Sequence, residues 1–432
     1  MSTTRSKRAI RTTALCAALA SSVALPFMAF AQDNDGGFLM TLRLAERFVS
    51  RDTRSPDPDL AAMSNQAITD ITLAVSSETR TEAVSLEVGS GYRFVDGSST
   101  DGFESEFTDP TLRLSYTQEA AASSITASIF ASSTSLDDVT TLDTAQTASG
   151  TLDPDFAEQT QAGGNRNRLR FDTKLTLRDD APFGLSFAVK VDDISYDNLP
   201  NGSSLSDYTY GLARVGARFD ITEIMQANLG LHVSQTAGTD TLNRYGIDAG
   251  LILTQPNGQI TLNLSATDGD DGSQRHLSAA RSFVLENTTT RFGIGASQAS
   301  TDDVFVTGSA SLKHTFADES PLGTFTATAD RRVTREGRTD EDVVTSLSVA
   351  ASYALNPVAN LRLSAGFAQS EDILSGDSVD VGQANLSLRY ALNSDWTASA
   401  GIGVQSRDPS ADAATDSTTL SLGLSRTFDL RR

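Results

Sequence analysis

Apolar and polar residues alternate with a period of two along most of the chain. In residues 84–94, for example, Val84 and Leu86 alternate with Ser85 and Glu87. Successive side chains of a β-strand point to opposite faces, whereas a helix would repeat its apolar positions every three or four residues. The sequence therefore predicts an all-β chain whose strands each have one apolar and one polar face.

The connections between these segments alternate between long and short. The long ones span residues 50–66, 95–109, 132–165, 193–207 and 406–417, and the short ones span 178–183, 220–224, 255–259, 356–360 and 393–395. A soluble β-sandwich also alternates, but here the polar faces carry long charged side chains in mid-strand. Together with the unequal connections, this pattern is typical of a transmembrane antiparallel β-barrel.

We predict about twenty strands between residues 37 and 430, within a range of 18 to 22. An even number is expected of such barrels, and roughly 9–11 residues are needed to cross a bilayer with a tilted strand. The least regular segments are 208–219, where the apolar register slips, and 275–285, where Arg281 falls on the apolar side.

The first 31 residues have the pattern of an export signal. Basic residues from Arg5 to Arg11 precede a mostly apolar stretch, and Ala29-Phe30-Ala31 matches a cleavage site. We therefore expect cleavage after Ala31, with a barrel formed by residues 32–432. The single cysteine, Cys16, lies inside the signal, so the exported chain has no disulfide to stabilise it.

Acidic residues outnumber basic ones, and the net charge of the chain is -21. Basic residues cluster only in the signal, so we expect no nucleic-acid partner. We also expect no enzymatic activity, no cofactor and no metal. His232 and His276 each share a strand face with a serine but have no evident acidic partner, and Asp268-Gly269-Asp270-Asp271-Gly272 lacks the spacing of a calcium loop.

Aromatic residues collect near the ends of the predicted strands, as they do in the two interfacial belts of membrane barrels. Those beside short turns are Tyr116, Phe219, Phe316, Tyr353, Tyr390 and Trp396. Those beside long loops are Phe48, Phe94, Tyr196, Tyr208 and Phe305.

The last predicted strand alternates Leu420, Leu422, Leu424 and Phe428, and then continues with Asp429 to Arg432. Over residues 36–432 the chain resembles a Gram-negative outer-membrane β-barrel of the porin type, although such barrels usually end on the aromatic residue. The resemblance implies a bacterial outer-membrane location, short periplasmic turns and long extracellular loops. It also implies contact with outer-membrane lipid, lipopolysaccharide and the barrel-assembly machinery, with a homo-oligomer as a further expectation.

If the apolar face of each strand meets lipid, the cations on the other face point into the lumen, because Arg at mid-bilayer costs roughly 2–4 kcal/mol. The predicted channel-lining residues are Arg43, Arg47, Arg93, Arg113, Arg168, Arg170, Lys174, Arg178, Arg214 and Arg218.

The longest predicted loop, 132–165, is the third long loop, which in classical trimeric porins folds into the lumen. Its acids are Asp137, Asp138, Asp143, Asp153, Asp155 and Glu158. One hypothesis is a constriction between these acids and Arg168, Arg170 and Lys174. Rings of charged side chains give pores their ion selectivity in this way. The alternative is solvated loop acids and an internal salt-bridge network that seals a narrow barrel.

The resemblance favours a channel for passive diffusion of small hydrophilic solutes. Two alternatives remain open from the sequence: a barrel that exports a polymer such as an exopolysaccharide, and a non-conducting structural or adhesive surface barrel.

Overall fold

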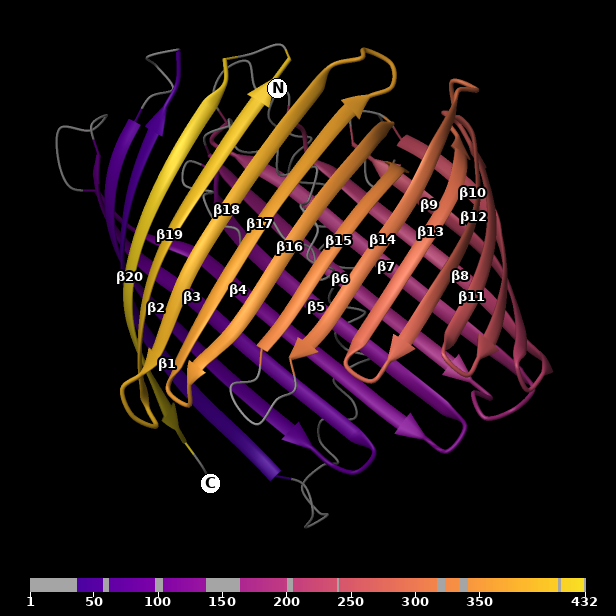
Figure 1. The fold of residues 1–432 in the computed structure, drawn as a ribbon, viewed down its shortest axis with the longest axis horizontal. Coiled ribbons are helices and arrows are strands. Elements are labelled where there is room, and N and C mark those ends of the chain that lie inside the picture. Colours follow the sequence, from indigo (N-terminus) through magenta and orange to yellow (C-terminus); the bar gives the residue numbers. More distant parts are fainter. Residues whose placement is uncertain are drawn as a thin grey trace, which may run out of the picture.

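The computed structural model describes residues 37–56, 62–97, 104–136, 164–199, 205–238, 241–316, 323–334, 341–410 and 413–430. These residues form twenty β-strands (Figure 1). The strands are β1 Gly37–Arg54, β2 Ala62–Glu78, β3 Glu82–Gly97, β4 Glu104–Ala120, β5 Ser123–Ser135, β6 Asn165–Leu177, β7 Phe183–Asp197, β8 Tyr208–Thr222, β9 Met225–Ala237, β10 Thr241–Gln255, β11 Gly258–Gly269, β12 Gly272–Leu285, β13 Thr288–Gln298, β14 Val304–Phe316, β15 Gly323–Thr334, β16 Asp342–Asn356, β17 Ala359–Asp372, β18 Ser378–Ala391, β19 Trp396–Pro409 and β20 Thr415–Asp429.

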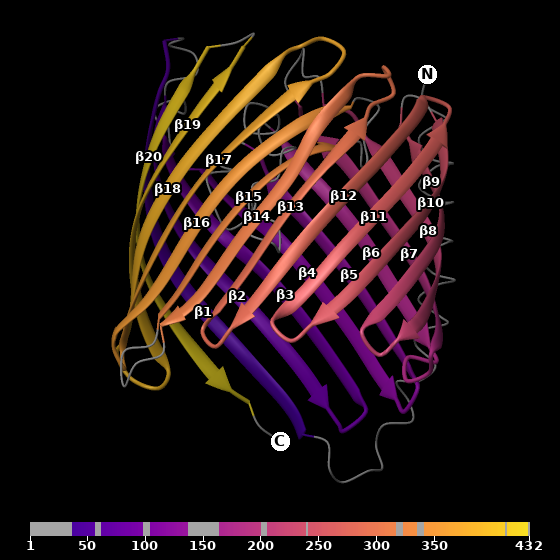
Figure 2. The same ribbon diagram turned by 45° about the vertical axis from the view of Figure 1, so that its right-hand side comes forward.

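The sheet is closed. Each strand pairs antiparallel with the strands before and after it in the chain, and β1 pairs with β20 from Thr41↔Asp429 to Arg54↔Asp416. Figures 1 and 2 show the resulting barrel of tilted strands from two sides. Closure removes the unpaired edges that an open sheet would expose. The predicted all-β barrel of twenty strands is confirmed, and the two least regular segments are β8 and β12.

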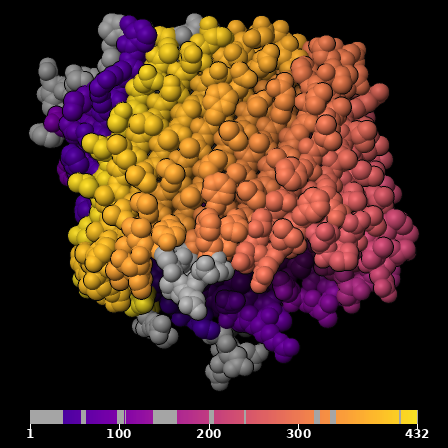
Figure 3. All heavy atoms as spheres, in the orientation of Figure 1, coloured from indigo at the N-terminus to yellow at the C-terminus, as the bar shows by residue number. Residues whose placement is uncertain are grey.

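The barrel is apolar outside and polar inside. On β9, Leu229, Leu231 and Val233 are 51%, 63% and 58% exposed on the outer wall. His232 and Ser234, between and beside them, point into the lumen because side chains alternate along a strand. Figure 3 shows the outer surface over the later strands as a continuous wall of side chains. An apolar exterior of this kind suits a hydrocarbon environment.

The two ends of the barrel differ in their connections. One end, here called the short-turn end, carries tight turns such as Pro256-Asn257 between β10 and β11. Gly258 after this turn has φ +140°, and a Cβ there would lie 2.1 Å from the carbonyl oxygen of Ser282. The position therefore requires glycine. The opposite end, here called the long-loop end, carries the connection between Ser135 and Asn165.

Several strands extend further at the long-loop end than the sequence predicts. β1 continues to Arg54 and β2 begins at Ala62, inside the predicted loop 50–66. Asp268 is in β11, and only Asp270 and Asp271 separate β11 from β12. Apolar alternation stops where the apolar wall ends, but backbone pairing continues with polar residues on both faces.

The aromatic belt at the long-loop end is only partly as predicted. Phe48 and Phe94 are exposed on the outer wall, but register places Tyr196, Tyr208 and Phe305 on the lumenal face. A shift of one residue along a strand moves a side chain to the other face of the sheet. An aromatic residue near a strand end can therefore face either the lipid or the lumen. Tyr92 and Phe107 are on the outer wall with Phe94 instead. The centroid of the Tyr92 ring lies 5.0 Å from that of Phe94 and 5.1 Å from that of Phe107. At the short-turn end, the outer wall carries the predicted residues Phe219, Phe316, Tyr353 and Tyr390.

The predicted signal, residues 1–31, and the predicted loop acids fall outside the described residues. Within the described ranges, no helix combines the length and the apolar character needed to span a membrane.

Candidate functional site

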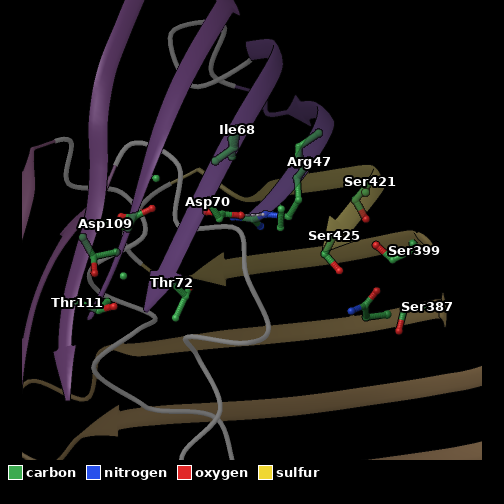
Figure 4. Close-up of a pocket in the computed structure, with 18 of the residues that line it drawn as sticks. Arg47, Ile68, Asp70, Thr72, Asp109, Thr111, Ser387, Ser399, Ser421 and Ser425 are labelled. Atoms are coloured by element: carbon green, nitrogen blue, oxygen red, sulfur yellow. Dashed lines mark hydrogen bonds and ion pairs between the residues drawn. The ribbon is translucent and has the colours of Figure 1, made fainter. Parts of the chain in front are cut away.

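The lumen contains a cavity of about 1500 Å³. Its lining comes from one continuous arc of the closed sheet, which runs from β15 to β20 and on through β1 to β6, so that the two ends of the arc face each other across the lumen. Figure 4 shows both sides of it: Asp70, Thr72 and Thr111 lie on one wall and Ser387, Ser399 and Ser421 on the other.

Basic residues dominate the charges around this cavity. The arginines that line it are Arg43, Arg47, Arg93, Arg113, Arg166, Arg168, Arg170, Arg362 and Arg389. The acids whose side chains belong to this lining are Asp70, Asp109 and Asp172, whereas Glu46 borders the cavity with its carboxylate on the outer wall. Seven of these nine arginines come from β1 to β6, so one wall of the lumen forms an arginine ladder. The lining of this cavity is therefore positive although the whole chain is acidic.

The facing wall carries hydroxyl and amide groups. Its lining includes Thr324, Thr326, Ser352, Asn360, Gln383, Asn385, Ser387, Ser399, Thr419, Ser421 and Ser425. Glycines keep this wall thin: a Cβ at Gly423 would lie 2.7 Å from the hydroxyl oxygen of Ser399. Such a wall offers many hydrogen-bonding groups to a hydrated solute.

Asp192 on β7 forms ion pairs with two of the predicted constriction cations. Arg168 donates to its two carboxylate oxygens at 2.8 and 2.6 Å, and Arg170 donates to one of them at 3.1 and 2.6 Å. Asp192 is 6% exposed. Charge-assisted, bidentate contacts of this kind are strong and fix both guanidinium planes against the wall. This arrangement matches the salt-bridge alternative for Arg168 and Arg170.

We expect Asp192→Asn to lower the free energy of unfolding by about 2–3 kcal/mol, because it leaves two guanidiniums without their counter-charge in a confined site. The measurement is urea unfolding of the barrel in lipid vesicles. Asp70→Asn is the matched control: its pair with Arg47, at 2.6 Å, is 31% and 43% exposed. A pair this exposed contributes at most about 1 kcal/mol. Equal losses in the two variants would contradict a special role of Asp192.

The other predicted lumenal cations have varied surroundings. Arg214 pairs with Asp248 at 3.0 Å, and Arg218 pairs with Asp179 at 2.7 Å. Arg93 is 5% exposed. Lys174 is on the lumenal face of β6, and Arg178 follows it in the turn, with its guanidinium 5.9 Å from the Phe183 ring centre. These residues thus come from β3, β6 and β8 and from the turn after β6.

Four arginines of the cavity make no ion pair with any described residue. They are Arg43, Arg113, Arg362 and Arg389, all exposed to the lumen. Arg113 lies 5.6 Å from the centre of the Phe130 ring, and register places Glu87 opposite it on β3. The sequence analysis missed Arg362 and Arg389, although each alternates with outward leucines, Leu361 and Leu363 or Leu386 and Leu388.

His232 has an acidic partner that the sequence analysis did not find. Its Nδ1 lies 3.1 Å from Asp248, which also holds Arg214, and its Nε2 lies 3.2 Å from the Thr267 hydroxyl. All of these groups share the lumenal wall of β8 to β11. In the described ranges, no three His, Cys, Asp or Glu side chains come close enough together to hold a metal ion.

An apolar cluster joins the two sides of the lumen near the long-loop end. Leu136, just after β5, packs with Ala368 on β17, and the two are 4% and 6% exposed. Tyr196, Leu199 and Leu205 pack against them from the end of β7 and the connection to β8. Because β5 and β17 are on opposite sides of the closed sheet, this contact narrows the lumen. The predicted loop acids, Asp137 to Glu158, lie outside the described residues, so their constriction stays a prediction.

No protein-family model matches the chain, and no curated protein matches it in sequence. Several solved structures are similar to the chain over most of its length, with TM-scores below 0.5. OccK5 (OpdH) of Pseudomonas aeruginosa has a TM-score of 0.39 and 11% identity, over 91% of this chain and 98% of that one. OccK7 (OpdD) of the same species has a TM-score of 0.42 and 10% identity, over 92% and 100%. The siderophore receptor PirA, also from P. aeruginosa, has a TM-score of 0.46 and 9% identity, over 92% and 81%.

At this identity the likenesses concern the fold alone. The chain's own features define that fold: a closed antiparallel sheet of twenty strands, an apolar outer wall, a polar lumen, and connections that are longer at one end than at the other. The chain has the fold of a porin-type outer-membrane β-barrel.

Proposed function

We propose that the chain is an outer-membrane channel through which small hydrophilic solutes diffuse, with anions favoured over cations. The observation that carries this proposal is the lumenal cavity, in which four arginines that make no ion pair with a described residue share the lining with many hydroxyl and amide groups. In this proposal residues 1–31 direct export and are removed after Ala31, and the outer wall lies in the bacterial outer membrane.

The preference for anions follows from the charges in the cavity. Arg43, Arg113, Arg362 and Arg389 make no ion pair with a described residue, although register places Glu87 opposite Arg113, so they add positive potential to the cavity. A lumen lined with one sign of charge and enclosed by a low-dielectric wall concentrates ions of the opposite sign. Rings of Arg and Lys favour anions in pores for this reason.

A second candidate is a sealed barrel with a structural or adhesive role. The apolar contact between Leu136 and Ala368 favours it, because apolar constrictions exclude water and block ions. In this case the arginine ladder would serve only to hold the wall together, as Arg168 and Arg170 do with Asp192.

Conductance of the purified full-length protein in a planar lipid bilayer separates the two candidates. We expect stepwise current increases and, in a salt gradient, a reversal potential that favours the anion. High salt should weaken the selectivity, because the Debye length falls from about 10 Å at 0.1 M to about 3 Å at 1 M. Insertion of folded barrels without current steps would contradict the channel and support the sealed barrel.

A further inference from the structure

The hydroxyl of Thr267 is hydrogen-bonded to a histidine that a carboxylate holds in turn. Nδ1 of His232 lies 3.1 Å from Asp248, and Nε2 lies 3.2 Å from the Thr267 hydroxyl oxygen. A carboxylate only accepts hydrogen bonds, so Nδ1 donates to Asp248. In the neutral ring Nε2 then carries the lone pair and accepts the Thr267 proton. A hydroxyl, a base and an acid that orients the base are, in this order, the parts of an activated nucleophile.

The fold builds this order from three consecutive strands. His232 is on β9, Asp248 on β10 and Thr267 on β11, all on the lumenal face (Figure 2, right). Gly246 on β10 is opposite both His232 and Thr267, and a Cβ there would lie 2.5 Å from Nε2 of His232. The glycine therefore lets the imidazole lie across β10 and reach a hydroxyl on a strand that β9 does not pair with.

Asp248 is also held from the side of β8. Arg214 pairs with its carboxylate at 3.0 Å. Gly230 on β9 lies beneath this contact: a Cβ there would lie 3.3 Å from guanidinium nitrogens of Arg214 and from a carboxylate oxygen of Asp248. The carboxylate is thus fixed from two sides, and a fixed carboxylate keeps the imidazole in one orientation.

The Thr267 hydroxyl can be reached from the lumen, and a further donor is beside it. Thr267 is half-buried, and the side chain of His232 is 15% exposed. Gln274 on β12 is directly opposite Thr267, so their Cβ atoms are about 4.5–5.5 Å apart. Its amide donates one N–H to Glu341 at 3.1 Å and has a second N–H. A side-chain amide at this place can donate to the oxygen of a carbonyl group that Thr267 attacks.

We propose that this wall of the lumen is a hydrolase site for carboxylic esters small enough to enter the barrel. The Thr267 oxygen attacks the ester carbonyl carbon, Nε2 of His232 takes the hydroxyl proton, and the carbonyl electron pair moves onto the oxygen beside Gln274. The carbonyl re-forms as the bond to the alcohol breaks, and the alcohol leaves with the proton from His232. Water then attacks the acyl-threonine in the same way, and Thr267 recovers its proton as the carboxylic acid leaves. One ester and one water give one acid and one alcohol.

This proposal goes beyond the diffusion of solutes. The sequence analysis expected no enzymatic activity because neither histidine had an evident acidic partner. Asp248 and Thr267 are 16 and 35 residues from His232, so only strand pairing brings the three together. The arginine cavity is lined by other strands, so the site does not rest on the ion selectivity of the lumen.

Hydrolysis of p-nitrophenyl acetate by the purified full-length barrel in detergent tests the site. Thr267→Val and His232→Gln should each lower the rate by about 100-fold, the usual contribution of a positioned base and its nucleophile. Thr267→Ser keeps a hydroxyl and should keep the activity. Thr261→Val is the matched control. Thr261 is on the same face of β11, opposite Ile252 and Ala280, and its replacement should leave the rate unchanged.

Asp248 is a positioning residue, because it acts through His232 and does not touch the ester. Asp248→Asn should therefore lower kcat while KM stays near the wild-type value. A loss that appeared in KM alone would contradict this role.

A phosphonofluoridate should phosphonylate the Thr267 oxygen as fluoride leaves, which mass spectrometry of the digested protein detects. His232→Gln should prevent the labelling, and resistance to protease checks that each variant is folded. Wild-type hydrolysis no faster than that of Thr267→Val, no label, or a label on another residue would each overturn the proposal. Conductance of the same preparations separates it from the channel: a barrel that conducts but does not hydrolyse overturns only the hydrolase site.

Discussion

Leu264→Arg should lower the free energy of unfolding of the barrel by about 2–4 kcal/mol, the cost of a cation at mid-bilayer on the lipid face. Leu264 is in the middle of β11 and is 53% exposed on the outer wall. Its register partners Ala249 and Leu277 are also on that wall, so the new guanidinium would find no acid beside it. Urea unfolding in lipid vesicles measures the loss.

The neighbouring substitution Ser265→Arg is the control, because it puts the same side chain on the other face of the same strand. Ser265 is opposite Asp248 on β10 and His276 on β12, both on the lumenal wall. An arginine there has water and a carboxylate within reach, so its cost should be well below that of Leu264→Arg. If Ser265→Arg proved the more damaging, the assignment of the outer wall to lipid would be wrong.

The strand number and the two faces could be predicted because each strand carries its own period-two signal. A strand needs no information from distant residues to show which side is apolar, so even the irregular segments 208–219 and 275–285 were identified as strands. Arg281 illustrates the limit. It is on the apolar side of β12, yet its guanidinium stacks 4.8 Å from the centre of the Phe283 ring and donates to Asn257 in the adjacent short turn. Near the edge of the apolar wall an arginine can reach polar groups. The alternation of apolar and polar residues does not show how far a residue lies from that edge.

The ion pairs were predictable only in part. The pair of Arg170 and Asp192 follows from pairing β6 and β7 outward from the turn between them, so the sequence contains a signal for it. The partner of Arg244 is Asp271, which belongs to the turn between β11 and β12. This ion pair depends on the conformation of a turn that does not contain Arg244. Which arginines remain without a partner is therefore a property of the assembled lumen.

The closure of the barrel and the apolar contact across it could not be predicted from local patterns. β1 and β20 pair over residues separated by almost the whole chain, and Ala368 meets Leu136 from the other side of the lumen. Ala368 is an ordinary lumenal residue of β17 in the sequence. Its role in narrowing the pore arises only because the connections after β5 and β7 bring leucines to it.

Replacing Arg43, Arg113, Arg362 and Arg389 together by Glu should reverse the ion selectivity of the channel. These four side chains are exposed to the lumen and make no ion pair with a described residue, so their replacement breaks no salt bridge in that part of the chain. The change removes four positive charges from the cavity and adds four negative ones, and the potential inside a confined pore follows the sign of its lining. The reversal potential in a salt gradient should move from anion-favouring to cation-favouring, with the larger shift at low ionic strength.

Arg331→Glu is the control for net charge alone, because register places Arg331 on the outer face of β15, away from the cavity. It should leave selectivity unchanged, whereas Arg362→Glu alone should already weaken the preference for anions. If the four-residue variant folded, conducted and kept the wild-type selectivity, the described cavity would not be the path that ions take. The contact between Leu136 and Ala368 would then mark the point where that cavity is closed. The arginines would stabilise the barrel wall and would not act on a passing solute.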